Sequence, residues 1–480
     1  EDEGKDKEIQ TNENDHVNVK MLDYWERSTR DDLDFLFNNV NSSTSKVLNS
    51  YFIDTLTESS NVPQFYNQEE FDNLRIKTLL KIKQRNEALR VLNNISTYDA
   101  YKNYYDRIKL DFYLATDKLS EACSFKDSLQ EFNADRNNFI LKVSIFCSFL
   151  ENKIEEADLL NSLLLDTQDK DDYFQKIYFN LKNDINDPIE IIQGSFHESS
   201  FSLYSAMIRI GSLPFTEKFL EFDITNLTLP IILNPATDIT LRLKSAHKAY
   251  ELDLFNAESL SALYQSVDFS LDELNNWEES LEKYTLRPEI GMALLFQNAR
   301  VQLLPITRLE SLKEFWKYAI INGLEKLAYN VSRNLIESTE PSVELSDYAI
   351  QLARAHIFNK NFQQAEKWIL FVENYVSQSN ELDQSDLDNV KFLYDLQKSK
   401  DEDTFIKNLE QNLIAKIKKE KTLNDYNETL KTIFSVILNE KDIIDKIIDE
   451  KKIVDDRSMP SSFIINTIND SSENNKIGEL

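Results

Sequence analysis

The sequence predicts an all-α fold, specifically an α-solenoid of tetratricopeptide-like helical hairpins. Ala88, Ala122 and Ala157 recur at intervals of 34 and 35 residues, each shortly after a polar turn. A period of about 34 residues with a small residue early in the second helix is typical of tetratricopeptide arrays. A bulky side chain there would push neighbouring helices apart. The chain has only six glycines, so tight turns with positive φ should be scarce and sheet-rich folds are disfavoured.

The first helix of each predicted hairpin is marked by an apolar-periodic stretch. These stretches cover residues 71–82, 105–114 and 140–150, each directly before one of the polar turns. An earlier helical pair is expected through 33–36 and 47–52, where apolar residues also follow helical spacing.

The centre of the chain is less regular. Residues 224–235 contain Pro230 and Pro235 among Ile, Leu and Thr, so we expect an extended connector there rather than a helix. Helical hairpins should resume at 241–246.

Residues 347–374 form the clearest single hairpin, with Ala353 and Ala365 on either side of its turn. The chain is therefore divided into five segments: a disordered acidic N-terminal segment at 1–20, N-terminal helical repeats at 21–200, a second helical-repeat region at 201–378, charged C-terminal helices at 379–458 and a flexible tail at 459–480.

The segment 379–458 contains long, charged, amphipathic patterns. Ile443, Ile444, Ile447 and Ile448 follow helical spacing with acidic and basic residues between them. This pattern favours a capping or accessory helix, and a partner-binding helix is the alternative.

The net charge of −29 disfavours nucleic acid as a partner, because phosphate binding needs a concentrated basic surface. The best basic run, Lys416, Lys418, Lys419 and Lys421, is interrupted by Glu420 and is interpreted as a solvated helix face. No stretch of the sequence approaches the apolar length of about 20 residues that a membrane span requires.

No local motif for catalysis, a cofactor or a metal is present in the sequence, so a non-catalytic protein without cofactors is expected. There is no glycine-rich phosphate loop and no nucleophile elbow. The acidic run 166–172 lacks the glycine of a calcium loop, and helix capping is the preferred interpretation. The four histidines are too far apart in sequence to suggest a metal site: His16, His197, His247 and His356.

The two cysteines, Cys123 and Cys147, fall in a predicted second helix and in the next first helix. Those helices would be antiparallel neighbours, so a disulfide is geometrically plausible. Two small buried thiols are the alternative. A disulfide would require an oxidising compartment such as the periplasm.

Several short stretches, in serial order, resemble an alphaproteobacterial helical-repeat family of unknown function whose members often carry the label "antifreeze glycopeptide" protein. The matching stretches are Tyr24-Trp25-Glu26-Arg27-Ser28, Glu121-Ala122-Cys123, Phe146-Cys147, Arg242-Leu243-Lys244-Ser245-Ala246, Ser261-Ala262-Leu263-Tyr264-Gln265 and the run at 293–299. The resemblance implies an exported helical-repeat protein in which both cysteines belong to the shared pattern, and it therefore favours the Cys123–Cys147 disulfide. The family supplies no biochemical activity.

These observations predict an exported, non-catalytic scaffold that binds a protein or peptide in a periplasmic or envelope assembly. The chain begins with Glu1 rather than Met, as it would after removal of a secretory signal or in a shortened expressed chain. The first-helix faces of a repeat array would line a binding groove. Candidate groove residues from helix phase are Tyr105, Lys109, Lys142, Arg354 and His356. The alternatives are a cytosolic solenoid subunit of a large complex and, less favoured, a platform for a cell-wall-active enzyme.

Overall fold

The structure is a computed structural model. It describes residues 29–40, 46–58, 62–63, 65–95, 99–126, 129, 134–167, 170–190, 196–376 and 384–398. The predictions made for 1–20, for Lys416–Lys421 and Ile443–Ile448, and for the tail at 459–480 lie outside these residues.

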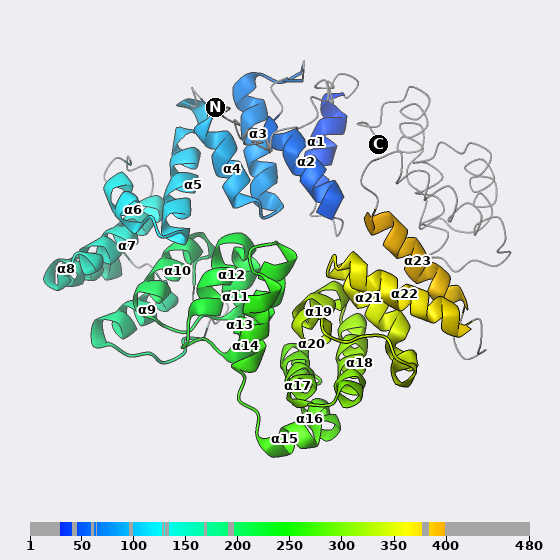
Figure 1. The fold of residues 1–480 in the computed structure, drawn as a ribbon. Helices are drawn as coiled ribbons and strands as arrows, with labels where there is room; N and C mark the ends of the chain where they lie inside the picture. Colours follow the sequence, from blue (N-terminus) through cyan, green and yellow to red (C-terminus); the bar gives the residue numbers. More distant parts are fainter. Residues whose placement is uncertain are drawn as a thin grey trace, which may run out of the picture. The chain divides into compact units, whose positions relative to one another are not determined.

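The described residues are helical and contain no β-strand, which confirms the predicted all-α class (Figure 1). The α-helices are α1 (Arg30–Asn39), α2 (Lys46–Glu58), α3 (Gln68–Lys81), α4 (Arg85–Asn93), α5 (Lys102–Ala115), α6 (Leu119–Lys126), α7 (Ala134–Leu150), α8 (Ile154–Asp166), α9 (Asp172–Asn183), α10 (Phe201–Ile210), α11 (Glu217–Phe222), α12 (Ile224–Leu233), α13 (Ile239–Glu251), α14 (Ala257–Gln265), α15 (Leu271–Asn275), α16 (Trp277–Lys283), α17 (Pro288–Val301), α18 (Pro305–Ile321), α19 (Glu325–Val331), α20 (Arg333–Ile336), α21 (Ala349–Phe358), α22 (Phe362–Val376) and α23 (Gln384–Lys398).

The chain divides into two units. One comprises Glu1–Leu33, Ser60–Tyr66 and Ser399–Leu480, and the other comprises Asp34–Ser59 and Asn67–Lys398. In the described part of the first unit, the Arg30 guanidinium donates to the Phe65 carbonyl over 3.2 Å and lies over the Tyr66 ring. All further description concerns the second unit.

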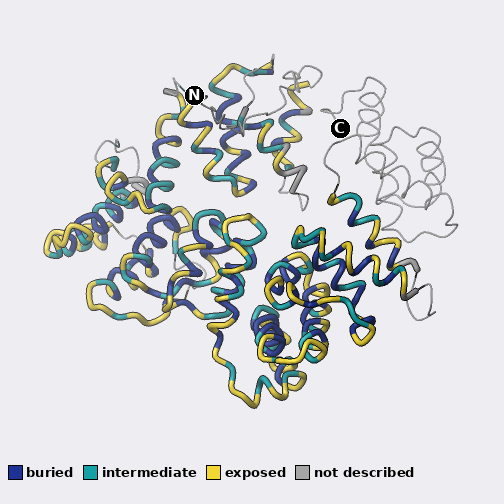
Figure 2. Tube along the Cα trace, in the orientation of Figure 1, coloured by how far each residue is buried: buried dark blue, intermediate teal, exposed yellow. Residues whose placement is uncertain are grey.

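Consecutive helices pack in neighbouring pairs, including α3 with α4, α5 with α6, α7 with α8, α17 with α18 and α21 with α22. The repeating alanines Ala88, Ala122 and Ala157 are fully buried in the second helix of three of these pairs. Figure 2 shows the resulting alternation of buried and exposed positions along the helices. The predicted pairing of helices and the predicted burial of the alanines are therefore both found.

In the described residues, seven helices end in the same kind of turn. A residue at the end of the helix adopts a left-handed conformation: the C-cap itself at Asp184, and the residue after the C-cap at Lys83, Asn152, Ser212, Asp253, Gly323 and Lys360. The next N–H then donates to the carbonyl five residues earlier, for example Gln84 to Leu79 over 2.8 Å. This bond satisfies one of the free carbonyls at the helix end. The expected scarcity of positive-φ turns is wrong, because six of these seven positions are occupied by residues other than glycine.

The turn also sets the position of the buried alanine. In four of the seven turns, the residue five positions after the left-handed residue is a fully buried alanine. These alanines are Ala88, Ala157, Ala328 and Ala365. The left-handed turn and the buried alanine of the next helix therefore recur together at these four places.

The expectation of an extended connector at 224–235 is also wrong, because residues Ile224–Leu233 form helix α12 with Pro230 inside it. The Asp223 side chain caps the helix by accepting from the Asn226 N–H over 3.2 Å. Leu227 and Ile231 are buried in the core. Burial of this apolar face offsets the backbone hydrogen bond that proline removes.

Helix α12 lies between two apolar cores of the second unit. Ile231 belongs to a core built from α5 to α12, and the adjacent Ile232 belongs to a core built from α12 to α23. Adjacent residues of a helix point in different directions, so α12 can contribute to both cores at once.

Cys123 on α6 and Cys147 on α7 form a disulfide, with their Cα atoms 5.7 Å apart. The disulfide therefore joins the neighbouring helices that the sequence pattern places side by side. It closes a loop of 24 residues in sequence separation, and a loop of this length is expected to stabilise the fold by about 3 kcal/mol.

The left-handed turns give a first prediction. Lys83→Gly should stabilise the protein by about 0.5–1 kcal/mol, because glycine adopts positive φ without the steric cost of a side chain. Lys176→Gly, at an exposed position inside α9, should instead destabilise it by about 1 kcal/mol. Urea denaturation of both variants would measure the two effects. Equal destabilisation by both substitutions would contradict the role assigned to the turn.

Candidate functional site

The residues predicted to line a groove do not form one surface. Tyr105, Lys142 and His356 are each only 1% exposed and therefore lie in the interior. Lys109 and Arg354 are partly exposed, and Arg354 forms an ion pair with Glu325 at 3.6 Å. These residues come from α5, α7 and α21, which contribute to two different cores. The groove residues predicted from helix phase therefore include buried positions as well as partly exposed ones.

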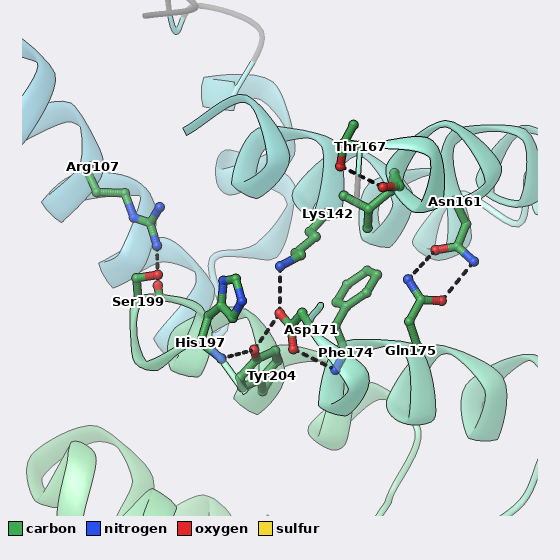
Figure 3. Close-up of polar contacts among 11 residues, drawn as sticks. Arg107, Lys142, Asn161, Thr167, Asp171, Phe174, Gln175, His197, Ser199 and Tyr204 are labelled. Carbon is green, nitrogen blue, oxygen red and sulfur yellow. Dashed lines mark hydrogen bonds and ion pairs between the residues drawn. The ribbon is translucent and has the colours of Figure 1, made fainter. Parts of the chain in front are cut away.

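Lys142 belongs to a buried polar cluster that is centred on the Asp171 carboxylate (Figure 3). Its ammonium group lies 2.6 Å from the Asp171 carboxylate, and both side chains are essentially inaccessible to solvent. The Tyr204 hydroxyl donates to the same carboxylate over 2.6 Å, and the His197 backbone N–H donates to that hydroxyl over 3.0 Å. Asp171 also accepts from the Phe174 N–H over 3.0 Å and caps α9.

The cluster therefore has a structural role, joining α7, the start of α9, α10 and the segment that leads into α10. Its charges compensate each other and its hydrogen bonds are directed inward, so it presents no group to a substrate. Removing one partner of a buried ion pair typically costs 3–5 kcal/mol. The interpretation of the acidic run 166–172 as helix capping is confirmed at Asp171.

Two histidines are buried on separate helices. His247 on α13 has its Nε2 atom 2.7 Å from the Tyr264 hydroxyl, and His356 lies in the interior of α21. Burial lowers the pKa of each imidazole to about 4. For His247 the neighbouring Lys248 adds to this effect, whereas for His356 the Glu340 carboxylate opposes it. Both rings are therefore neutral near pH 7. No cluster of three or more potential metal ligands occurs in the described residues.

A cleft of about 580 Å³ forms where three stretches far apart in sequence meet. The first stretch is the turn between α13 and α14, the second runs along α19 and α20, and the third is the turn between α21 and α22. The lining side chains are Tyr250, Asp253, Leu254, Phe255, Asn256, Ala257, Glu258, Ser261, Lys326, Asn330, Val331, Arg333, Asn334, Phe358, Asn359 and Lys360. We refer to this feature as the turn cleft.

The turn cleft combines three kinds of side chain. Partly buried aromatic rings come from Tyr250, Phe255 and Phe358. Four carboxamides surround them, from Asn256, Asn330, Asn334 and Asn359. Asn330 donates to the Tyr250 hydroxyl, and Asn359 donates to the Tyr329 carbonyl over 3.0 Å, so two of the amides are held in place. The charged residues are Asp253, Glu258, Lys326, Arg333 and Lys360.

A second hollow, of about 460 Å³, lies between α8 and α9 and has a different character. Most of its polar side chains bind one another. Lys182 pairs with Asp158 at 2.7 Å, and the Tyr178 hydroxyl donates to the same carboxylate. Asn161 and Gln175 exchange two amide hydrogen bonds, which Figure 3 shows. With these groups already paired, the turn cleft is the better candidate for ligand binding.

Sequence reasoning missed the turn cleft, because its three segments are separated by many residues. The turn asparagines Asn256 and Asn359 were visible as polar turn residues before a second helix. Their convergence with Asn330 and Arg333 depends on how α19 packs against α14 and α21.

Comparison of the chain with protein-family models, curated proteins and solved structures gave no match. Among the described residues, no helix is both long enough and apolar enough to span a membrane.

The buried histidines give a prediction about pH. Their pKa is about 4 in the fold and about 6.5 in an unfolded chain, so the unfolded state binds more protons between these values. Stability is therefore lost as the pH falls from about 6.5 to 4, by about 2 kcal/mol per histidine at pH 5. His356→Leu should reduce the loss between pH 7 and pH 5 by about this amount in urea denaturation.

As a control, Asn103→Leu, at an exposed position of α5, should keep the pH dependence of the wild-type protein. An unchanged pH dependence in His356→Leu would show that this imidazole is not held neutral by burial.

Proposed function

We propose that this protein is a non-catalytic scaffold of tetratricopeptide-like hairpins that binds an extended segment of a protein or peptide partner in the turn cleft. One observation carries the proposal: two inter-helix turns and the α19–α20 stretch converge around a cleft that is lined by aromatic rings and carboxamides.

This lining suits a peptide chain. A bound extended peptide must satisfy its own backbone N–H and C=O groups, and each asparagine side chain offers both donors and acceptors. The half-buried rings of Phe255 and Phe358 offer apolar contact for side chains of the partner. The cleft volume of about 580 Å³ is in the range of ligand-binding pockets.

The turn cleft is a different surface from the first-helix faces that the sequence predicted as the groove. Tyr105, Lys142 and His356 are already used in packing and cannot contact a partner without unfolding. The turn residues of the cleft, by contrast, are mostly exposed: Asp253, Asn256, Glu258 and Lys360.

We further propose that the scaffold is exported and works in a periplasmic or envelope assembly. The Cys123–Cys147 disulfide supports this, because disulfides persist mainly in oxidising compartments. The resemblance to an exported repeat family points the same way. The alternative, a cytosolic subunit of a large complex, would require the two cysteines to be reduced in the native protein.

The cleft can be tested by selecting peptides from a random display library on the intact protein. Asn334→Trp would fill the cleft from α20 and should weaken the selected peptides roughly tenfold or more. Asn103→Trp, an equivalent change at an exposed position of α5, should leave their affinity unchanged. If every selected peptide binds wild type and Asn334→Trp equally, the recognition surface lies elsewhere.

Export can be tested by intact-mass spectrometry of protein purified from its native source and alkylated at lysis. Oxidised protein should resist alkylation and gain about two daltons on reduction, the mass of two hydrogens. Two alkylated thiols without prior reduction would support the cytosolic alternative.

A further inference from the structure

We propose that the segment bound in the turn cleft is acidic, with its carboxylates paired to Lys326, Arg333 and Lys360. This inference rests on the proposed function and specifies the chemistry of the partner.

The three cations come from three separate elements that converge on the cleft. Lys326 is on α19, Arg333 is on α20 and Lys360 is the left-handed residue of the turn after α21. All three side chains are exposed. Their positions depend on the packing of these helices, so no short basic motif marks them in the sequence.

These cations also lack ion-pair partners among the described residues, although the chain has a net charge of −29. Two cations on the neighbouring helices α21 and α22 are paired. Arg354 on α21 pairs with Glu325 at 3.6 Å, and Lys367 on α22 pairs with Glu340 at 2.9 Å. In a protein so rich in carboxylates, three unpaired cations around one cleft favour an acidic ligand.

The acidic residues of the cleft come from a different pair of helices. Asp253 and Glu258 come from the turn between α13 and α14 and the start of α14. The cleft is therefore polarised, with its basic side on α19, α20 and the turn after α21. Carboxylates of a bound segment would lie along that side, and Asp253 and Glu258 would repel a segment bound in the reversed register.

Exposed ion pairs are individually weak, but three together should change affinity by roughly tenfold. The probes are peptides from the random library whose binding Asn334→Trp weakens, prepared with a fluorescein label. Each is compared with a version in which Gln replaces every Asp and Glu. We expect these peptides to be rich in Asp and Glu, and the Gln versions to bind roughly tenfold more weakly in fluorescence anisotropy.

A charge reversal gives a second readout. In the triple variant Lys326→Glu, Arg333→Glu and Lys360→Glu, the acidic peptides should lose their advantage, and versions with Lys at the acidic positions should bind better than the originals. A control variant with the same change in net charge is available at exposed positions outside the cleft, namely Lys83→Glu, Lys170→Glu and Arg300→Glu. It should keep the preference for the acidic peptides.

The outcomes separate this inference from the proposed function. If peptides depend on Asn334 but bind equally well with Gln in place of Asp and Glu, the acidic partner is excluded and the peptide-binding function stands. A preference for basic peptides would exclude it as well. If no selected peptide depends on Asn334, the proposed function itself fails.

Discussion

The left-handed turn is the constraint on which the rest of the described fold depends. A helix that ends with this turn reverses direction within two or three residues and satisfies a free carbonyl through the bond to the following N–H. In four of the seven described turns, the residue five positions after the left-handed residue is fully buried in the next helix. At Ala88, Ala157, Ala328 and Ala365 that residue is alanine, because the two helix backbones approach too closely for a larger side chain.

Interactions between hairpins are more varied than those within them. The Lys142–Asp171 pair, with Tyr204 bound to the same carboxylate, joins helices α7, α9 and α10 through buried charges. Helix α12 joins two cores through the adjacent residues Ile231 and Ile232. Elsewhere the arginine fork of Arg209 donates to the carbonyls at the end of α5, including Ala115 at 2.6 Å. These three contacts differ from one another, so the described helices are joined by more than one kind of interface.

The same turns that form the hairpins also create the candidate binding site. Asp253 and Lys360 hold left-handed conformations in two turns that line the turn cleft, and both residues are exposed. Exposed side chains in these turns do not pack in the apolar core, so their chemical type can differ without disturbing it. This freedom explains how aromatic rings, carboxamides and unpaired cations can gather in one place of an acidic helical protein.

By itself, the sequence determined the helical class, the hairpins around Ala88, Ala122, Ala157 and Ala365, and the capping by Asp171. These features depend on spacing within one hairpin, and local spacing decides which side of a helix is buried. The tertiary structure alone decided that residues 224–233 are helical despite Pro230, that Lys142 and His356 are buried, and that Asn330, Arg333 and Lys360 meet at one cleft. Those outcomes depend on contacts between distant segments, where the burial of apolar surface and the pairing of charges override local preference.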